Sequence, residues 1–181
     1  MRLETERLLI REWEDADRAP YARFAGDPDV RRYYIDVLTR RQTDEMIDRF
    51  IAGYRRDGFG FLPVIRKADG ALLGDVGIIP VGMPIRGNPP VEIGWLLGKD
   101  YWGQGYAPEA ARAWLDHAFG ALGLPEVVAW TARINLPSQR VMQKLGMTRD
   151  PADDFAHPKV PADHELRPHV LYRIGRPTAR A

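Results

Sequence analysis

The sequence predicts a mixed α/β fold in which helices cover both faces of one central sheet. Apolar residues alternate in some segments, as in strands, and recur at helical spacing in others. Three strand segments follow one another between residues 59 and 97, and helix and strand segments alternate after residue 108. At 181 residues the chain is long enough for one core, so a single domain over 1–181 is expected.

The first half of the chain is expected to hold one strand, three helices and then two more strands. In the longest helix Ile47, Phe50 and Ile51 fall on one face, and Gly58 follows its end. The turn Ala68-Asp69-Gly70 separates the two later strands, as in a hairpin. The expected elements are a strand over 5–13, helices over 14–25, 29–34 and 39–56, strands over 59–66 and 71–81, and a Pro- and Gly-rich loop over 82–90.

The second half is expected to alternate strands and helices and then become irregular. Asn135 is a good N-cap for a helix whose apolar face includes Met142 and Leu145, and Gly146 suits its C-terminal end. The expected elements are a strand over 91–97, a helix from Pro108, a strand over 126–131, a helix over 135–145, an irregular segment over 148–167, a strand over 169–174 and a frayed end over 178–181.

Composition excludes several classes of function. The 26 basic and 25 acidic residues nearly balance, so nothing indicates a nucleic-acid or membrane partner. The absence of cysteine excludes disulfides, thiolate metal sites and a cysteine nucleophile. The four histidines lack metal-ligand spacing, so no metal is expected. The N-terminus lacks the apolar core of a signal peptide and no apolar run is long enough to span a membrane, so a cytoplasmic location is the default expectation.

The stretch from Glu92 to Ala111 organises the rest of the chain. It begins as a strand, turns at Gly98-Lys99-Asp100, continues as a glycine-rich loop over 102–107 and opens a helix at Pro108. Glycines let the main chain approach a ligand closely, and a helix N-terminus presents unpaired N–H groups with partial positive charge. Such a loop suits a phosphate, although on spacing alone a plain strand-to-helix connection fits equally well. It is neither a Walker loop nor a dinucleotide fingerprint.

Three motifs resemble those of the GNAT superfamily of N-acetyltransferases. Gly105-Tyr106-Ala107 matches the second half of the family's pyrophosphate loop, Arg/Gln-x-x-Gly-x-Gly/Ala, whereas Trp102 departs from its first position. The segment from Asn135 to Met147 is similar to the family's Asn-x-x-Ser-x-x-Val/Leu-x-x-Lys-x-Gly-Phe, with methionine in place of the aromatic residue. The opening Thr5 to Arg11, together with Trp102, is typical of the branch that acetylates the N-terminal alanine or serine of ribosomal proteins. The resemblance covers nearly the whole chain.

The resemblance implies a GNAT-like fold, with a mixed, mostly antiparallel central sheet flanked by helices and a cleft where the central strands splay. It implies acetyl-CoA as co-substrate, without a metal. It also implies direct attack, in a ternary complex, by the primary amine of a protein N-terminus or a small molecule. The residues expected to contact acetyl-CoA are Trp95, Leu96, Leu97, Trp102, Gly103, Gln104, Gly105, Tyr106, Ala107, Pro108, Asn135 and Ser138.

Three residues are candidates for the chemistry. The resemblance implies a base at Glu92, acting directly or through water, and a proton donor to the departing thiolate at Ser138. His157, in the irregular segment, lies near where that branch can carry a second base. Each has a plainer reading: an exposed or salt-bridged strand residue for Glu92, a first-turn helix residue for Ser138 and a solvated loop residue for His157.

Two other classes of function stay open from the sequence. One is a non-catalytic CoA-binding module that senses or docks, and the other is a phosphate-binding module unrelated to acyl transfer. Glu92 and Ser138 favour the enzyme, because a pure binder needs only the loop. The expected partners are acetyl-CoA and an amine acceptor, with a homodimer left open. The acceptor itself depends on the loops over 33–41, 82–90 and 150–167, whose shapes the sequence does not reveal.

Overall fold

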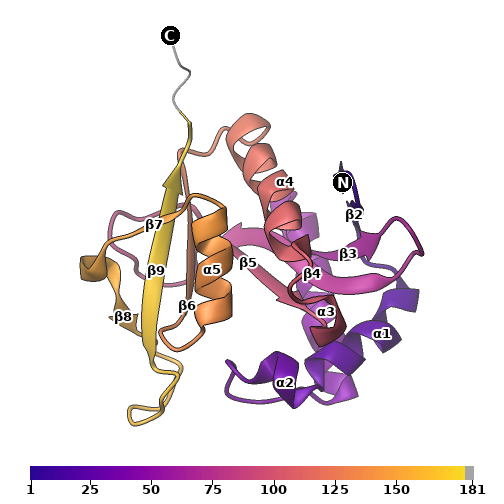
Figure 1. Cartoon of the computed structure of the whole chain (residues 1–181), viewed down its shortest axis with the longest axis horizontal. Helices are drawn as coiled ribbons and strands as arrows, with labels where there is room; N and C mark the ends of the chain where they lie inside the picture. The colour runs from indigo at the N-terminus through magenta and orange to yellow at the C-terminus, as the bar shows by residue number, and fades with distance from the viewer. Residues whose placement is uncertain (178–181) are drawn as a thin grey trace.

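One sheet runs through the whole molecule (Figure 1). The computed structural model describes residues 1–177. Neighbouring strands follow the order β1-β2-β3-β4-β5-β6-β9-β7, and β8 pairs with β9; all pairs are antiparallel except β5 with β6. The strands are β1 Arg2–Glu4, β2 Leu8–Arg11, β3 Phe61–Arg66, β4 Leu72–Pro80, β5 Val91–Leu97, β6 Glu126–Ala132, β7 Thr148–Arg149, β8 Phe155–Ala156 and β9 Pro168–Gly175.

Helices flank this sheet, as the sequence predicts. In Figure 1, α4 crosses in front of the central strands and α3 lies behind them. The buried Trp114 of α4 donates from Nε1 to the Val76 carbonyl of β4 at 2.9 Å, which fixes α4 on the sheet. The helices are α1 Asp15–Ala25, α2 Pro28–Arg31, α3 Arg40–Asp57, α4 Tyr106–Gly120 and α5 Leu136–Lys144, with single 3-10 turns at Lys99–Tyr101 and Pro151–Asp153.

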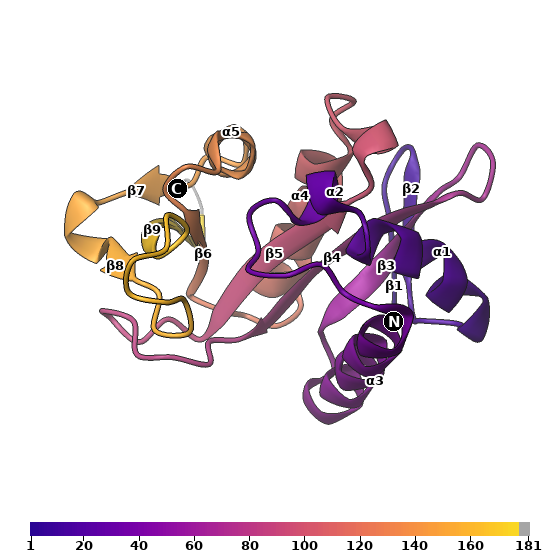
Figure 2. The same ribbon diagram turned by 90° about the horizontal axis from the view of Figure 1, so that it is seen from below.

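The sheet opens between β5 and β6. β4 pairs with β5 along seven residues, from Gly74 opposite Leu97 to Pro80 opposite Val91. β5 and β6 are parallel and share one register pair, Glu92 with Val128. Beyond that point the β6-facing edge of β5 has no strand partner among residues 1–177, and Figure 2 shows the two halves of the molecule diverging there. The predicted cleft between splayed central strands is therefore confirmed.

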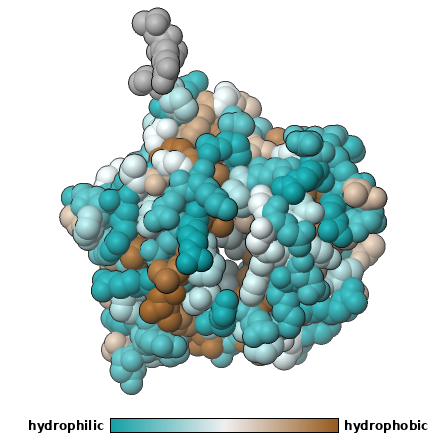
Figure 3. Space-filling model, viewed as in Figure 1, coloured by the Kyte–Doolittle hydropathy of each residue, from teal (hydrophilic) through white to brown (hydrophobic). Residues whose placement is uncertain are grey.

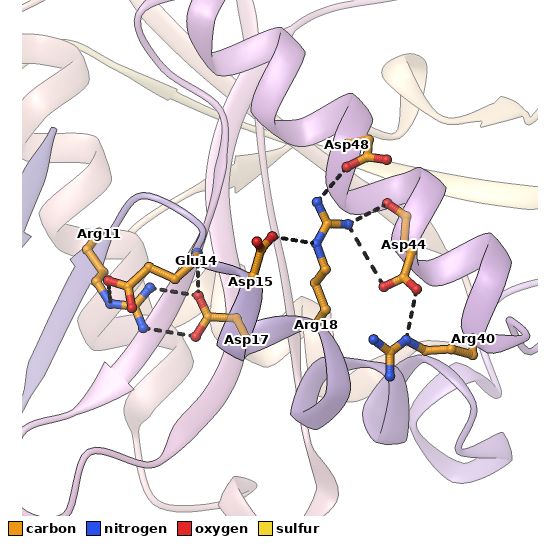
Figure 4. Close-up of polar contacts among 8 residues, drawn as sticks. All are labelled: Arg11, Glu14, Asp15, Asp17, Arg18, Arg40, Asp44 and Asp48. Carbon is orange, nitrogen blue, oxygen red and sulfur yellow. Dashed lines mark hydrogen bonds and ion pairs between the residues drawn. The ribbon is translucent and has the colours of Figure 1, made fainter.

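Ion pairs attach α1 to both the sheet and α3 (Figure 4). The Arg11 guanidinium on β2 donates to both carboxylate oxygens of the buried Asp17, at 2.7 and 2.9 Å. From α1, Arg18 reaches Asp48 of α3 at 2.6 Å. Charge-assisted bidentate contacts have a fixed geometry, so α1 is held in one orientation. The segment that follows it, which includes α2, is thereby held beside the cleft.

Some predicted boundaries were wrong. The first strand begins at Leu8 and not at residue 5, because a turn follows β1, a short strand that the sequence did not predict. The second helix ends at Arg31, and α4 begins at Tyr106, two residues before Pro108. The segment 148–167 contains β7 and β8, which form only by pairing with β9 and are too short to show a period. The frayed end predicted over 178–181 lies outside the described residues.

Candidate active site

Two cavities meet in the cleft. The first, of about 420 Å³, lies against the glycine-rich loop and the first turns of α4 and α5. The second, of about 410 Å³, lies over β4 and β5 and reaches the segment after β8. Figure 3 shows this face of the molecule hollowed near its centre. We call them the loop cavity and the strand cavity. Their shared walls are Tyr33, Tyr34, Trp95, Leu96, Asn135 and Ser138.

Main chain of the glycine-rich loop lines the loop cavity. Among the described residues, the N–H groups of this loop from Gly103 to Ala107 have no carbonyl partner. Gly103 and Gly105 have φ values of +74° and +83°, which glycine adopts at little cost. Within residues 1–177, no main-chain N–H from Gly103 to Ala107 donates to another protein group. Pro108 has no N–H, and the next donor, Glu109, bonds the Gly105 carbonyl at 3.2 Å. A run of free donors at a helix N-terminus is a site for an anion such as a pyrophosphate.

The start of the chain holds this loop in place. Glu109, in the first turn of α4, accepts from Thr5 Oγ1 at 2.5 Å and from Arg7 Nε at 2.7 Å. Arg7 Nη1 also donates to the Gln104 carbonyl at 3.1 Å, and its guanidinium lies 4.5 Å from the centre of the Tyr106 ring. The opening motif therefore has a structural role: through Thr5 and Arg7 it holds the glycine-rich loop and the first turn of α4 in place. Gln104 belongs to this clamp and does not line the loop cavity.

Trp102 occupies its unusual position by turning back onto the sheet. Its Nε1 donates to the Leu97 carbonyl at the end of β5 at 2.8 Å, and the residue remains 42% exposed. The Arg32 guanidinium lies 5.6 Å from its ring centre. The indole thus closes the turn between β5 and the loop and presents an apolar face to the loop cavity. An arginine or glutamine side chain at this position would offer polar donors to the cavity, whereas tryptophan offers packing.

The first turn of α5 is a connected hydrogen-bond network. The buried Asn135 caps the helix by accepting from the Ser138 main-chain N–H at 3.2 Å, and its Nδ2 donates to Thr131 Oγ1 at 2.8 Å. Ser138 Oγ accepts from Asn135 Nδ2 at 3.1 Å and from Trp95 Nε1 at 3.3 Å. Both lone pairs of this hydroxyl are therefore engaged, which leaves its O–H free to donate into the cleft where the two cavities meet.

Glu92 lies on β5 at the point where β5 and β6 begin to diverge. It faces Val128 at the last paired position of β5 and β6, and its side chain lines the strand cavity. Among the described residues, its buried Oε2 has no hydrogen-bond partner. Burial raises the pKa of Glu92 to about 8, against the opposing effect of Lys159. A carboxylate with a pKa near the working pH can exchange a proton with an amine in either direction.

His157 also lines the strand cavity but is arranged differently. Its ring lies 4.7 Å from that of His169, and its Nδ1 accepts from the Lys159 main-chain N–H at 3.3 Å. Burial, with a smaller effect of Lys159, lowers the pKa of His157, so the ring is neutral at pH 7. A neutral ring that accepts at Nδ1 carries its proton on Nε2 and is a donor there. This geometry favours Glu92 over His157 as the proton acceptor.

Comparison with known proteins identifies the family. Residues 7–148, most of the chain, match the sequence profile of the acetyltransferase (GNAT) domain. The chain belongs to the GNAT acetyltransferase family. It is 33% identical over 174 residues to the uncharacterized N-acetyltransferase YnaD of Bacillus subtilis strain 168, and the match covers 96% of each chain.

Solved GNAT structures share the whole fold. A GNAT acetyltransferase from Bacillus anthracis is 30% identical, with a TM-score of 0.80 and coverage of 97% of this chain and 99% of that one. RimJ of Mycobacterium smegmatis, in complex with CoA-disulfide, shares the fold at 21% identity, with a TM-score of 0.71 and coverage of 93% of this chain and 81% of that one. The present GNAT chain is thus an acetyl-CoA-dependent acyltransferase, as its motifs predict.

The structure of this GNAT protein brings most of the predicted site residues together. Apart from Gln104, every residue expected to contact the cofactor lines the loop cavity. Glu92, Ser138 and His157 all line the strand cavity, and Ser138 lines both. In residues 1–177 no cluster of histidine or acidic residues is suited to hold a metal ion. None of the helices described there is long and apolar enough to cross a membrane.

Sequence reasoning missed several residues of the strand cavity. The most informative is Asp75, a buried carboxylate in the middle of β4 that the cavity reaches. Arg31 of α2 also lines it, together with Tyr33 and Tyr34, which belong to the loop over 33–41 on which the acceptor was expected to depend. A signal for Asp75 is present in the sequence, because it is a single charged residue inside the apolar strand LLGDVGII. Arg31 gives no such signal, because α2 approaches β5 only in the folded chain.

Proposed function

We propose that this enzyme moves the acetyl group of acetyl-CoA to a primary amine by direct attack in a ternary complex. The observation that carries the proposal is the meeting of the two cavities at Trp95, Leu96 and Ser138. A cofactor seated in the loop cavity would bring its thioester to that junction, and an amine in the strand cavity would reach it from the other side. The amine belongs to a protein N-terminus or a small molecule.

In the cofactor site, the free N–H groups from Gly103 to Ala107 would bind the pyrophosphate. The unpaired edge of β5 beyond Glu92 would bind the pantetheine arm, because it offers main-chain donors and acceptors without a strand partner. Asn135 would orient the first turn of α5 against that arm. The complex of RimJ with CoA-disulfide, a protein of the same fold, supports a CoA ligand in this family.

In the acyl-transfer step, Glu92 accepts the proton that the amine loses, directly or through water. The amine nitrogen forms a bond to the acetyl carbon, and the carbon–sulfur bond breaks with its electron pair on sulfur. The free O–H of Ser138 donates a proton to this thiolate and regains one from water. Ser138 is suited to the task because Trp95 and Asn135 already occupy its acceptor sites. A pure CoA-binding module would need neither group.

The test is a turnover assay in which acetyl-CoA and a panel of amines are incubated with the protein. A thiol reagent measures released CoA, and mass spectrometry detects the acetylated amine. The panel should include peptides that begin with alanine or serine and simple alkylamines. The proposal expects CoA release that depends on the amine and equals the acetylated product. CoA that binds without amine-dependent turnover for any acceptor would favour a sensor or docking module instead.

A further inference from the structure

Asp75 is a buried carboxylate that the reaction described above does not use. It lies on β4 between apolar neighbours, with 3% of its surface exposed, and it lines the strand cavity. Among residues 1–177 its carboxylate has one side-chain hydrogen-bond partner, the hydroxyl of the fully buried Tyr21, which donates to it. Burial raises the pKa of Asp75 to about 7. A buried carboxylate with so few partners is costly, which is typical of a group kept for a ligand.

Asp75 and Glu92 face the same cavity from two places on the sheet. Asp75 is opposite Leu96 in the β4–β5 register, and Glu92 lies four residues before Leu96. Opposite residues, and residues an even number apart on one strand, share a face of a sheet. With about 3.3 Å per residue along the strand and about 5 Å across, the two Cα atoms lie roughly 14 Å apart. Gly94 and Gly77 lie opposite each other between them.

Neither carboxylate has an ion-pair partner within 4.0 Å among the described residues, although two cations line the cavity. Arg31 donates from Nε to the Asp36 carbonyl at 3.0 Å, and its guanidinium lies 3.9 Å from the Tyr34 ring centre. Arg31 acts on Asp75, and Lys159 on Glu92, only at longer range, where each positive charge opposes the effect of burial on the pKa of the carboxylate. The contacts that would compensate both carboxylates are therefore left for a ligand that carries positive charge at two points.

The walls between the two carboxylates are apolar. The Phe61 ring lies over Gly94, where an added Cβ would be 3.0 Å from it. Aromatic and thioether side chains complete the walls, namely Met46, Phe50, Trp95 and Trp130. Such walls suit a hydrocarbon chain, since burying methylene groups is favourable and the faces of aromatic rings attract a cation.

We propose that the strand cavity binds an acceptor with two ammonium groups joined by a short alkyl chain, one group at Glu92 and the other at Asp75 and Tyr21. The inference rests on the proposed function and names its substrate class. The amine at Glu92 loses its proton and attacks the thioester, whereas the amine at Asp75 keeps its proton and holds the acceptor in place. Two ammonium groups a short distance apart occur in a free diamine. They also occur in a peptide whose second residue is lysine, where one is the N-terminus and the other is the lysine side chain.

The experiment compares two acceptors of equal length, 1,5-diaminopentane and n-hexylamine, which replaces the second ammonium by a methyl group. The proposal expects kcat/KM to be higher for the diamine by about tenfold to a hundredfold, the usual contribution of a hydrogen bond between charged groups. Two peptides with serine first, and lysine or norleucine second, form the other arm. A preference for the diamine alone identifies a free small molecule as the source, and a preference for the lysine peptide identifies a polypeptide.

Asp75→Asn is the decisive variant because it removes the charge and keeps the shape. It should abolish the preference for the second ammonium, measured as the ratio of kcat/KM for 1,5-diaminopentane to that for n-hexylamine. Tyr21→Phe should reduce this ratio less. Calorimetry measures the affinity of the CoA-loaded protein for 1,5-diaminopentane, and this measurement does not require that any amine is acetylated. If the diamine binds but no amine is acetylated, the proposed function fails while the diamine site stands. Equal kcat/KM for the two acceptors, or a preference that survives in a folded Asp75→Asn protein, would overturn the inference. So would equal calorimetric affinity for the two amines.

Discussion

The loop cavity and the strand cavity are nearly equal in size, at about 420 and 410 Å³, yet they are built in different ways. The loop cavity takes its donors from main chain, in the loop from Gly103 to Ala107, and its helix cap from Asn135. The strand cavity takes its chemistry from side chains on distant segments, with Asp75 on β4, Glu92 on β5 and His157 after β8.

Binding by main-chain donors, as in the loop cavity, can be shared by many sequences. Binding by side chains, as in the strand cavity, is particular to this chain. Main-chain donors persist when side chains change, provided that glycine supplies the required φ values. Side-chain carboxylates in a buried cavity can be exchanged one at a time, and under the proposed function each exchange would change which amine fits. The loop cavity should therefore accept the same cofactor across relatives, whereas the strand cavity should differ. Each experiment below perturbs one side and asks whether the other follows.

The largest effect is expected for Glu92→Gln, on the strand side. We expect turnover at pH 8 to fall by about a hundredfold or more, the usual contribution of a single acid–base group. Because the pKa of Glu92 is about 8, its charged form and the rate of the unmodified enzyme should rise with pH up to that value. The variant should lack this rise and should recover only near the acceptor's own pKa, where neutral amine becomes abundant.

The matched control for Glu92→Gln is Glu6→Gln, which removes an exposed carboxylate outside both cavities. CoA affinity, measured by calorimetry, should be unchanged in both variants because neither touches the loop. Unaltered turnover of Glu92→Gln across the pH range would make Glu92 structural. His157 would then be the next base to test.

Gly105→Val should have the second largest effect, on the loop side. A non-glycine residue at φ +83° is strained by about 1–2 kcal/mol, more when branched, and the added Cβ would lie 3.4 Å from Arg7 Nη2. We expect CoA affinity to fall by about tenfold or more, as measured by calorimetry. The control is Gly82→Val, where φ is not left-handed and the space around the Cβ is open. A folded Gly105→Val protein with normal CoA affinity would disprove the main-chain cradle.

Ser138→Ala tests the junction of the two cavities. We expect a loss of about tenfold in turnover at pH 7 that shrinks above pH 8.5, because a thiol of that pKa then leaves readily as thiolate. Ser138→Thr retains the hydroxyl and should retain most activity. The measurement is the pH profile of CoA release for the three proteins. A loss that is constant with pH would assign Ser138 to packing and not to proton donation.

Asn135→Ala should have the smallest effect, and it separates capping from binding. Loss of the cap should lower the free energy of unfolding by about 1 kcal/mol. Thr39→Ala is the control, since Thr39 caps α3 through its side chain and lies in neither cavity. Urea unfolding should show similar losses for both, whereas the KM for acetyl-CoA should rise only for Asn135→Ala. An unchanged KM would leave Asn135 with the capping role alone.

Sequence by itself determined the α/β class, most of the elements and nearly the whole loop cavity. The reason is that the loop site is local: a strand, two glycines, a helix N-terminus and an N-capped helix are each written in a few consecutive residues. The element boundaries predicted from sequence were wrong where strand pairing decides them, as in β7 and β8, which form only by pairing with β9. The start of α4 at Tyr106 was missed because the free N–H groups before Pro108 need no intrahelical partner.

Only the tertiary structure decided the strand cavity. Glu92 could be predicted as a candidate, but its pKa of about 8 follows from burial beside the splay of β5 from β6. The tautomer that disfavours His157 depends on one main-chain N–H from Lys159. Asp75 reaches the same cavity because β4 pairs with β5 in one register, and a shift of one residue would turn it to the opposite face. Burial and register are properties of the folded chain, and under the proposed function they would determine which amine fits.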